Sequence, residues 1–299
     1  MKIKYWIKAA RLRTLPLALS SILMGGALAF INNFKVSIPI ILLAIITTLL
    51  LQILSNFAND YGDGIKGTDK YRTNSDRMVQ SGKISSRQML VTIIITSFVT
   101  FIVGAFLLLK VFGFQNLMYF SIFLIIGVLA IIAAIKYTVG KNAYGYKGFG
   151  DVFVFIFFGG IGVIGSYFLF TKAYDIITIA GAFFTGLLSC GVLNMNNMRD
   201  YENDKISNKN TLVVLIGLKN ARIYQYISII GAFFSLLIIL FYSKNNYLWV
   251  TTIPFIMLFK HLIYISRNDN LNKLDGQLKL IAISCFATCM ILFITSYFI

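Results

Sequence analysis

The chain has 299 residues, of which 58% are hydrophobic and only 13% are charged, and its formal net charge is +16. Soluble globular proteins carry about a quarter charged residues, so this composition excludes an ordinary soluble domain. A strongly positive charge can also indicate a nucleic-acid-binding protein, in which the bases gather on one exposed surface. The positions of the apolar runs and of the bases therefore decide the class.

Long apolar runs recur along the whole chain. A helix needs about 20 mainly apolar residues to cross a hydrocarbon core about 30 Å thick, and the sequence contains nine such runs. They lack the alternating pattern of a membrane β-barrel. We therefore predict an all-α, polytopic membrane protein that forms one integral-membrane domain over residues 1–299. The predicted spans are Leu15–Ile31, Val36–Ala58, Met89–Leu109, Leu117–Ile135, Val152–Thr171, Ile176–Leu193, Tyr226–Tyr242, Tyr247–Ile265 and Leu280–Phe298.

The first apolar run follows a basic N-terminal tail, which is also the pattern of a cleaved signal peptide. The run from Leu15 to Ile31 is nevertheless long enough to span a membrane, and eight more runs follow it. We therefore predict that it is retained as the first transmembrane helix.

The Lys and Arg residues are distributed unevenly between the two predicted sides of the membrane. Of the 27 Lys and Arg, 22 lie in the N-terminal tail and the even-numbered connections, and only Lys35, Lys110, Lys172 and Lys244 lie in the odd-numbered ones; Lys260 lies inside the eighth predicted span. By the positive-inside rule, the N-terminus is cytoplasmic and the C-terminus lies outside. The charge thus reports the topology of a multi-pass protein of the inner cell membrane, and we expect no nucleic-acid partner.

The acidic residues gather in two places, both on the predicted cytoplasmic side. Seven of the 11 Asp and Glu lie in the connections after the second and the sixth span. Four spans separate these connections, and an even number of crossings returns the chain to the side that it left. The two clusters can therefore meet. They are "NFANDYGDGIKGTD", Asn56 to Asp69, and "NMNNMRDYEND", which ends at Asp204.

Both clusters show helical spacing. Asn56, Asp60 and Asp63 stand at i, i+4 and i+7, and the corresponding residues of the second cluster stand at i, i+4 and i+8. Each cluster continues directly from an apolar span. We therefore predict two polar stripes on the inner ends of the second and sixth helices. The residues of the second stripe are Asn196, Asp200 and Asp204.

Carboxylates that face one another repel unless a cation lies between them. A set of Asp, Asn and water oxygens suits Mg²⁺ better than zinc, and protein-bound Mg²⁺ is usually shared with substrate phosphates. Two opposed aspartate pairs thus predict a site for a metal-bridged diphosphate, although acids at helix ends can also form a plain solvated face. Nearby bases suited to phosphate oxygens are Lys66, Arg72, Lys141, Arg199 and Lys205, each of which can instead be an inside-face topology charge.

The two clusters resemble the aspartate-rich motifs of the UbiA superfamily of intramembrane prenyltransferases, which have nine transmembrane helices. The branch that prenylates 1,4-dihydroxy-2-naphthoate is the most similar one, and the likeness extends from Ala10 to Gly217. Further similar stretches are "ARLRTLPLALSSILMG", "YTVGKNAYGYKGFGDVFVFIFFG" and "KNTLVVLIG". One departure is that the superfamily pattern NDxxDxxxD has Gly67 at its fourth place, and the next carboxylate is Asp69.

The resemblance implies a helical bundle around a central chamber and a function for the clusters. Mg²⁺ ions would bridge the diphosphate of a polyprenyl donor, held by Asp60, Asp63, Asp200 and Asp204. Asn56, Asn59, Asn196 and Asn197 would complete or orient the shell, and Tyr137 or Tyr61 would steady an allylic cation. The naphthoate ring would then attack with loss of CO₂, and the product would be demethylmenaquinone.

Other functions predict other patterns. A secondary transporter would carry its acids at midspan on broken helices, whereas here they lie at helix ends. Another acceptor, such as 4-hydroxybenzoate, haem or a glycerol phosphate, is the alternative within the superfamily. The single histidine, His261, excludes a His-rich metal site and lies in an apolar run, where a structural role is expected. The expected surroundings of the enzyme are membrane lipid, with its active site toward the cytoplasm.

Overall fold

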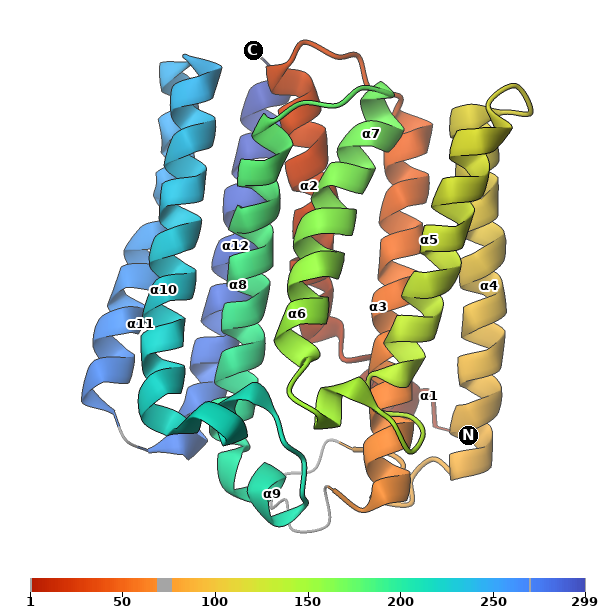
Figure 1. The fold of residues 1–299 in the computed structure, drawn as a ribbon, viewed down its shortest axis with the longest axis vertical. Helices are drawn as coiled ribbons and strands as arrows, with labels where there is room; N and C mark the ends of the chain where they lie inside the picture. The colour runs from red at the N-terminus through yellow and green to blue at the C-terminus, as the bar shows by residue number, and fades with distance from the viewer. Residues whose placement is uncertain (1, 69–76, 269, 299) are drawn as a thin grey trace. The chain divides into compact units, whose positions relative to one another are not determined.

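The computed structural model describes residues 2–68, 77–268 and 270–298, and within these ranges it contains helices but no strand (Figure 1). One isolated β-bridge joins Lys147 and Asn210. The all-α prediction is therefore confirmed for the described chain. The α-helices are α1 (Ile3–Ala10), α2 (Leu15–Ile31), α3 (Ile38–Lys66), α4 (Ser86–Phe112), α5 (Leu117–Lys136), α6 (Gly150–Val154), α7 (Ser166–Thr171), α8 (Ile177–Arg199), α9 (Tyr201–Ile206), α10 (Leu212–Ser243), α11 (Phe255–Arg267) and α12 (Asp275–Tyr297). The remaining helical segments are η1 (Leu12–Thr14), η2 (Tyr144–Tyr146), η3 (Phe155–Gly165), η4 (Asn246–Thr252) and η5 (Leu271–Leu274).

Nine helical stretches of the described chain are long and apolar enough to cross a membrane, as predicted. Large hydrophobic side chains are exposed along most of them, which is the surface that lipid covers in a multi-pass membrane protein. The largest difference from the sequence prediction is in α10, which begins at Leu212 and is interrupted at Gly217, whose backbone is not helical (φ 78°, ψ 161°). The stretches are Ile3–Ile31, Ile38–Lys66, Ser86–Phe112, Leu117–Lys136, Gly150–Thr171, Ile177–Arg199, Leu212–Ser243, Asn246–Arg267 and Asp275–Tyr297.

The chain folds as two compact units, which are described separately. Unit 1 comprises Met1–Leu15, Leu42–Gly150 and Glu202–Thr211. Unit 2 comprises Pro16–Ile41, Asp151–Tyr201 and Leu212–Ile299. A single domain around a central chamber, and a cytoplasmic N-terminus, stay predictions.

In unit 1, α3, α4 and α5 lie side by side (Figure 1). The short helix α1 packs on α3, where the rings of Trp6 and Phe57 meet edge to face at 5.9 Å. At 1.5 Å per residue the 29 residues of α3 extend about 44 Å, which exceeds a hydrocarbon core of about 30 Å. The polar last turns of α3 can therefore lie at the aqueous edge of the membrane while its first turns remain in lipid.

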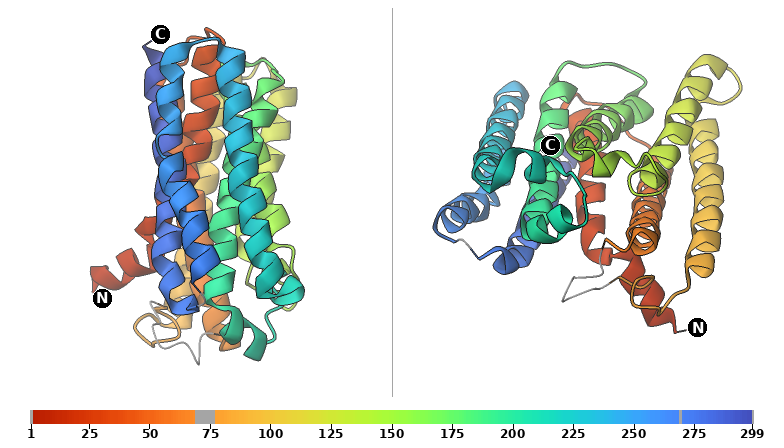
Figure 2. Two further views of the ribbon diagram at one scale, coloured as in Figure 1. Left: turned by 90° about the vertical axis from the view of Figure 1, so that its left-hand side faces the viewer. Right: turned by 60° about the horizontal axis from the view of Figure 1, so that its bottom comes forward.

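In unit 2, α8 packs against α10, η3 and α12 (Figure 2). The segment η3 is a π-helix, whose hydrogen bonds join residues five apart. Two side-chain hydroxyls also donate to its Phe158 carbonyl, Ser21 Oγ at 2.6 Å and Thr185 Oγ1 at 3.2 Å. This arrangement lets an irregular helix remain inside an apolar unit.

A buried chain of hydrogen bonds crosses α8, α10, α11 and α12. Asn194 Nδ2 donates to Gln225 Oε1 at 2.9 Å, and Gln225 Nε2 contacts His261 Nε2 at 3.2 Å. His261 Nδ1 contacts Gln277 Oε1 at 2.8 Å. Gln225 accepts from Asn194 through Oε1, so its Nε2 donates to His261 Nε2. Gln277 Oε1 accepts the hydrogen on His261 Nδ1, and the imidazole is neutral. The predicted structural role of His261 is therefore confirmed.

Candidate active site

The first acidic cluster lies on the last turns of α3, and the structure confirms that it is helical. Asn56, Asp60 and Asp63 are all buried, because the chain folds back over this face of the helix. The segment that folds back leads into α4, and a capping box formed by Ser85 and Gln88 caps the N-terminus of this helix. The sequence therefore predicted the position of these carboxylates but not their burial.

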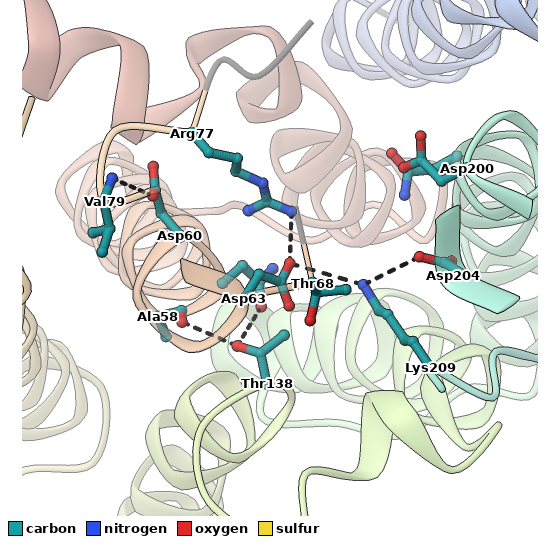
Figure 3. A network of polar contacts seen from close by, with 12 residues as sticks. Ala58, Asp60, Asp63, Thr68, Arg77, Val79, Thr138, Asp200, Asp204 and Lys209 are labelled. Carbon is teal, nitrogen blue, oxygen red and sulfur yellow. Dashed lines mark hydrogen bonds and ion pairs between the residues drawn. The ribbon is translucent and has the colours of Figure 1, made fainter. Parts of the chain in front are cut away.

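Asp60 anchors this returning segment. Its Oδ2 accepts the backbone N–H of Met78 at 2.9 Å, and its Oδ1 accepts that of Val79 at 3.0 Å (Figure 3). Met78 is itself buried in the apolar cluster of unit 1, between α1, α3 and α4. Two backbone donors stabilise the ionised form of a carboxylate and fix its orientation.

Asp63 is the centre of a more extended network (Figure 3). Its Oδ2 accepts a hydrogen bond of 2.7 Å from Arg77 Nη2 and lies 3.8 Å from Lys209 Nζ. Its Oδ1 accepts a hydrogen bond of 2.7 Å from the Tyr146 hydroxyl. A carboxylate that is 1% exposed thus has two cationic neighbours and one neutral donor, as a buried charge requires.

Lys209 joins the two acidic clusters. Its ammonium nitrogen lies 3.8 Å from Asp63 Oδ2 and 4.0 Å from Asp204 Oδ1, so it stands between a carboxylate of each cluster (Figure 3). Asp204 is also buried. The prediction that the two clusters meet is therefore confirmed for this pair of aspartates within unit 1. A joint grip of Asp60 and Asp200 on one headgroup stays a prediction.

The second cluster also binds the end of α3 directly. Asn203 Nδ2 and Ser207 Oγ both donate to the carbonyl of Thr68, at 3.0 and 3.1 Å. The remaining oxygen of the same amide, Asn203 Oδ1, is buried and has no hydrogen-bond partner in the described part of the chain. An unpaired buried oxygen is costly unless something else binds it.

The Gly- and Tyr-rich connection after α5 contributes Tyr146, which the sequence analysis did not single out. Its hydroxyl bonds Asp63 and also contacts Thr68 Oγ1 at 2.6 Å. The ammonium of Lys66 lies 3.8 Å from the centre of its ring, and that of Lys209 lies 5.2 Å away. Cations over an aromatic face are attracted by its quadrupole. Tyr146 thus orders one carboxylate and two lysines at once.

The same connection is held in place at its start. The Tyr144 hydroxyl donates to the Ala133 carbonyl at 2.9 Å, and burial raises the pKa of this phenol above its usual value, so it stays neutral. The ring of Tyr144 meets that of Tyr137 edge to face at 5.3 Å. The backbone N–H of Gly145 donates to the Tyr137 carbonyl at 3.0 Å. The predicted cation-steadying residue Tyr137 therefore lies at the base of this connection.

The end of α5 touches the first cluster through Thr138. Its Oγ1 donates to the Ala58 carbonyl at 3.0 Å and lies 3.2 Å from Asn59 Oδ1. The contact needs a glycine, because a Cβ on Gly62 would stand 2.8 Å from the backbone carbon of Thr138. Gly62, which lies between Asp60 and Asp63 in the motif, is therefore needed for the close packing of α3 against Thr138.

Asn56 has a different neighbourhood from the one that the sequence predicted. Its Nδ2 donates to the Ala10 carbonyl at 2.8 Å and to Thr14 Oγ1 at 3.0 Å, so it holds the end of α1 and η1 against α3. Binding of substrate by Asn56 stays a prediction, but its amide already positions the N-terminal segment.

In unit 2, the end of α8 forms a second polar network. Arg199 donates to both oxygens of Asp200, at 2.9 and 2.8 Å, and to Asn196 Oδ1 at 2.8 Å; it also pairs with Asp275. The guanidinium that the sequence analysis assigned to phosphate is thus engaged with carboxylates.

The predicted second stripe is not one continuous helical face. The helix α8 ends at Arg199, and Asp200 caps it with φ −93° and ψ 8° before α9 begins. The expectation that Asp204 continues the stripe of Asn196 and Asp200 is therefore wrong. The break has a physical reason, since Asp is a poor residue for a helix interior and favours ends and turns.

The remaining predicted site residues differ in their surroundings. Lys66, Lys141 and Lys205 are exposed, whereas Asn197 is buried on α8. Arg72 and Asp69 lie outside the described residues. Sequence reasoning missed Arg77, Tyr146, Asn203 and Lys209. All four lie within or beside the quoted motifs, so proximity to them was the only available signal.

Three side chains of the two clusters carry oxygen donors of the kind that Mg²⁺ prefers. They are the carboxylates of Asp63 and Asp204, which flank Lys209, and the amide of Asn203, whose Oδ1 is unpaired. Within the described chain, no three His, Cys, Asp or Glu side chains gather as a metal-binding group. Mg²⁺ is usually held by one or two carboxylates together with water and substrate phosphates, and donors of this chemistry suit it.

Comparison with known proteins gives a consistent result. A model of the UbiA prenyltransferase family matches residues 18–294. The chain is 40% identical over 290 residues to a 1,4-dihydroxy-2-naphthoate octaprenyltransferase of Haemophilus influenzae, covering 94% of this chain and 93% of that protein. It is 41% identical over 264 residues to the Escherichia coli protein of the same name, covering 88% and 85%.

Solved structures of similar fold are known. A UbiA homolog from Aeropyrum pernix matches with a TM-score of 0.63 and 14% identity, covering 95% of this chain and 98% of that one. A UbiA homolog from Archaeoglobus fulgidus bound to GPP and Mg²⁺ matches with a TM-score of 0.60 and 16% identity, covering 97% and 99%. At these identities the likeness establishes the fold.

Proposed function

Because the chain belongs to the UbiA prenyltransferase family, we propose that it transfers a polyprenyl group from polyprenyl diphosphate to 1,4-dihydroxy-2-naphthoate in menaquinone biosynthesis. Diphosphate and CO₂ are released, and the ring product is formed at the quinol level, as the reduced form of demethylmenaquinone. The acceptor is supported by relatives of that name at 35–41% identity. The diphosphate is supported by one observation above all: Asp63 and Asp204, from the two acidic clusters, flank a single ammonium group.

The residues of the site have complementary roles in this proposal. Asp60, Asp63, Asp200 and Asp204 would hold Mg²⁺, which would supply positive charge to the diphosphate leaving group. Lys209 and Arg77 add fixed positive charge beside Asp63. Such charges are already oriented before reaction, so they stabilise the developing negative charge without reorganisation.

The reaction exchanges one carbon–oxygen bond for one carbon–carbon bond. The bond between the first prenyl carbon and the diphosphate oxygen breaks, and its electron pair leaves with the diphosphate. The ring carbon that bears the carboxylate of the naphthoate then bonds to the allylic carbon. Loss of CO₂ returns the electron pair of the broken bond to the ring and restores its aromaticity. Tyr137 is the proposed aromatic partner of the allylic cation.

We further propose that the enzyme is an inner-membrane protein whose site faces the cytoplasm. The bases near the clusters support this orientation, because 22 of 27 Lys and Arg lie on that side. A position at the edge of the bilayer suits both parts of the donor, since isoprene units dissolve in lipid and a diphosphate needs water.

The acceptor is tested by giving the purified protein octaprenyl diphosphate, Mg²⁺ and one of two aromatic acids. With 1,4-dihydroxy-2-naphthoate, we expect a product whose mass equals prenylation with loss of CO₂. With 4-hydroxybenzoate, we expect no product above background. Prenylation of the benzoate alone would refute the proposed acceptor while retaining the reaction class.

The site is tested by a matched pair of substitutions in α9. Asp204→Asn should abolish Mg²⁺-dependent transfer, because it removes a carboxylate that faces Lys209. Glu202→Gln makes the same chemical change two residues earlier, at an exposed position, and should leave the rate near that of the wild type. Equal rates for the two variants would contradict the assignment of the second cluster.

A further inference from the structure

A basic cleft lies at the C-terminal end of α11, in unit 2 and outside the acidic clusters. Its volume is about 450 Å³. Three of the six described residues that line it are cations, and none of these described residues is a carboxylate. The lining residues are Lys260, Ile263, Tyr264, Arg267, Asn268 and Lys273.

One face of α11 leads from lipid to this cleft. Ile256, Lys260, Ile263 and Arg267 follow one another at spacings of three or four residues, so they share a face. Ile256 is 57% exposed and Ile263 is 53% exposed. The opposite face is buried against the rest of unit 2; it carries Phe255, Leu258, His261 and Ile265. In a membrane-spanning stretch the exposed face is the one that lipid covers.

Lys260 is the unusual member of this face. It lies seven residues before Arg267, which is about 10 Å along a helix axis, and therefore well inside the span Asn246–Arg267. A charged group on a lipid-facing surface is costly, so a lysine there extends toward the interface and seeks an anion. Lys260 lines the same cleft as Arg267 and Lys273, so three positive charges share one small volume.

We propose that this cleft binds the phosphate headgroup of an anionic membrane phospholipid, with an acyl chain along Ile256 and Ile263. Basic clefts beside transmembrane helices are suited to such headgroups. The polar wall of the cleft is ordered, since Asn268 Nδ2 donates to the Tyr264 hydroxyl and Arg222 Nη2 lies 3.4 Å from the Asn268 carbonyl.

A lipid fits better than a free phosphate for two reasons. An exposed isoleucine, Ile263, forms part of the wall, and it offers nothing to a free anion. The apolar face then continues from the cleft along α11 through Ile256, which matches a headgroup attached to a chain. The shared chemistry is the phosphate group, so the test must separate the two sources.

The test measures lipid retained by the intact protein. The purified protein is exchanged into mixed micelles of phosphatidylglycerol and phosphatidylcholine at equal concentrations, and native mass spectrometry counts the adducts. The wild type should retain phosphatidylglycerol preferentially. The double variant Lys260→Gln, Arg267→Gln should lose about tenfold or more of this preference, since each base near an anionic headgroup contributes severalfold.

A charge-matched control is the double variant Lys219→Gln, Lys279→Gln, which removes two exposed lysines of unit 2 that do not line the cleft. It should retain the wild-type preference, and both doubles should keep the wild-type melting temperature. An equal loss in both variants would show a general charge effect and overturn the proposal.

The second arm distinguishes the source of the phosphate. Inorganic phosphate and diphosphate are added separately, and the melting temperature of each variant is recorded. The proposal expects no stabilisation that depends on Lys260 and Arg267. Such stabilisation, together with unchanged lipid retention in the first double variant, would assign the cleft to a free anion instead.

Discussion

Asp63 and Asp200 both belong to the acidic clusters, yet their carboxylates are held in opposite ways. Asp200, in unit 2, is bonded through both oxygens to Arg199, its immediate neighbour in the chain. Asp63, in unit 1, takes its partners from three distant segments. These partners are Arg77, Tyr146 and Lys209. The difference shows that residue spacing can predict a local ion pair, whereas the connections between helices determine the long-range network.

The largest expected effect comes from breaking the long-range network at its centre. Asp63→Asn should lower transfer about a thousandfold, as loss of preorganised charge at an active site does. It should also destabilise the protein by about 3 kcal/mol, because Arg77 and Lys209 lose a buried counter-ion. Product formation and thermal unfolding in detergent measure the two effects.

Asp200→Asn sharpens the same comparison. Transfer should again fall strongly, but unfolding should change less, because Arg199 keeps Asn196 and Asp275 as partners. Equal destabilisation by the two substitutions would contradict the distinction between the distributed network and the local pair.

The next largest effect concerns the lysine that joins the clusters. Lys209→Gln should lower transfer about a hundredfold, because both Asp63 and Asp204 lose a charge-assisted neighbour. Lys205→Gln is the matched control, since it removes an exposed lysine four residues earlier. Rates with octaprenyl diphosphate distinguish the two. A larger effect at Lys205 would support the sequence-based assignment and contradict the structural one.

These contrasts show how far the sequence could predict this molecule. The nine spans follow from apolar length alone, and the helical position of Asp60 and Asp63 follows from their spacing on a continuing helix. The break at Asp200 was not predicted, because helical spacing extrapolates through any residue. The π-helix η3 was not predicted either, because an apolar run has the same composition in an α-helix and in a π-helix.

The partners of the carboxylates were beyond sequence reasoning for a related reason. The stretch Tyr137–Asp151 is rich in Gly and Tyr, but nothing in its composition separates Tyr146 from Tyr144. In the folded connection, the Tyr146 hydroxyl donates to Asp63, whereas the Tyr144 hydroxyl donates to the Ala133 carbonyl. In the same way, Lys205 and Lys209 both closely follow the second acidic cluster in the sequence, so the sequence does not distinguish them. They differ in position because Lys209 lies beyond the turn that follows α9.

A smaller effect is expected from the glycine that lets α5 approach α3. Gly62→Ala places a Cβ 2.8 Å from the backbone of Thr138, so it should destabilise the protein by about 1 to 3 kcal/mol. Gly127→Ala is the control: its Cβ meets nothing within 4 Å, and alanine favours a helix. The unfolding temperature should therefore fall only for Gly62→Ala. Unchanged unfolding of that variant would contradict the close contact.

The smallest effect comes from one hydroxyl in the connection after α5. Tyr146→Phe keeps the ring beside Lys66 and Lys209 but removes the hydrogen bond to Asp63, so this carboxylate should bind Mg²⁺ with a less defined orientation. About tenfold more Mg²⁺ should be needed for half-maximal transfer, since a hydrogen bond to a charged group contributes about 1.5 kcal/mol.

Tyr144→Phe removes a hydroxyl from the same connection, but one whose hydrogen bond ends on the Ala133 carbonyl and not on a carboxylate. It should leave the Mg²⁺ requirement unchanged and affect only thermal unfolding. Calorimetric titration of the substrate-free protein with Mg²⁺ separates binding from turnover, and only Tyr146→Phe should weaken it. If both phenylalanine variants shift equally, Tyr146 acts by packing the connection and not by orienting Asp63.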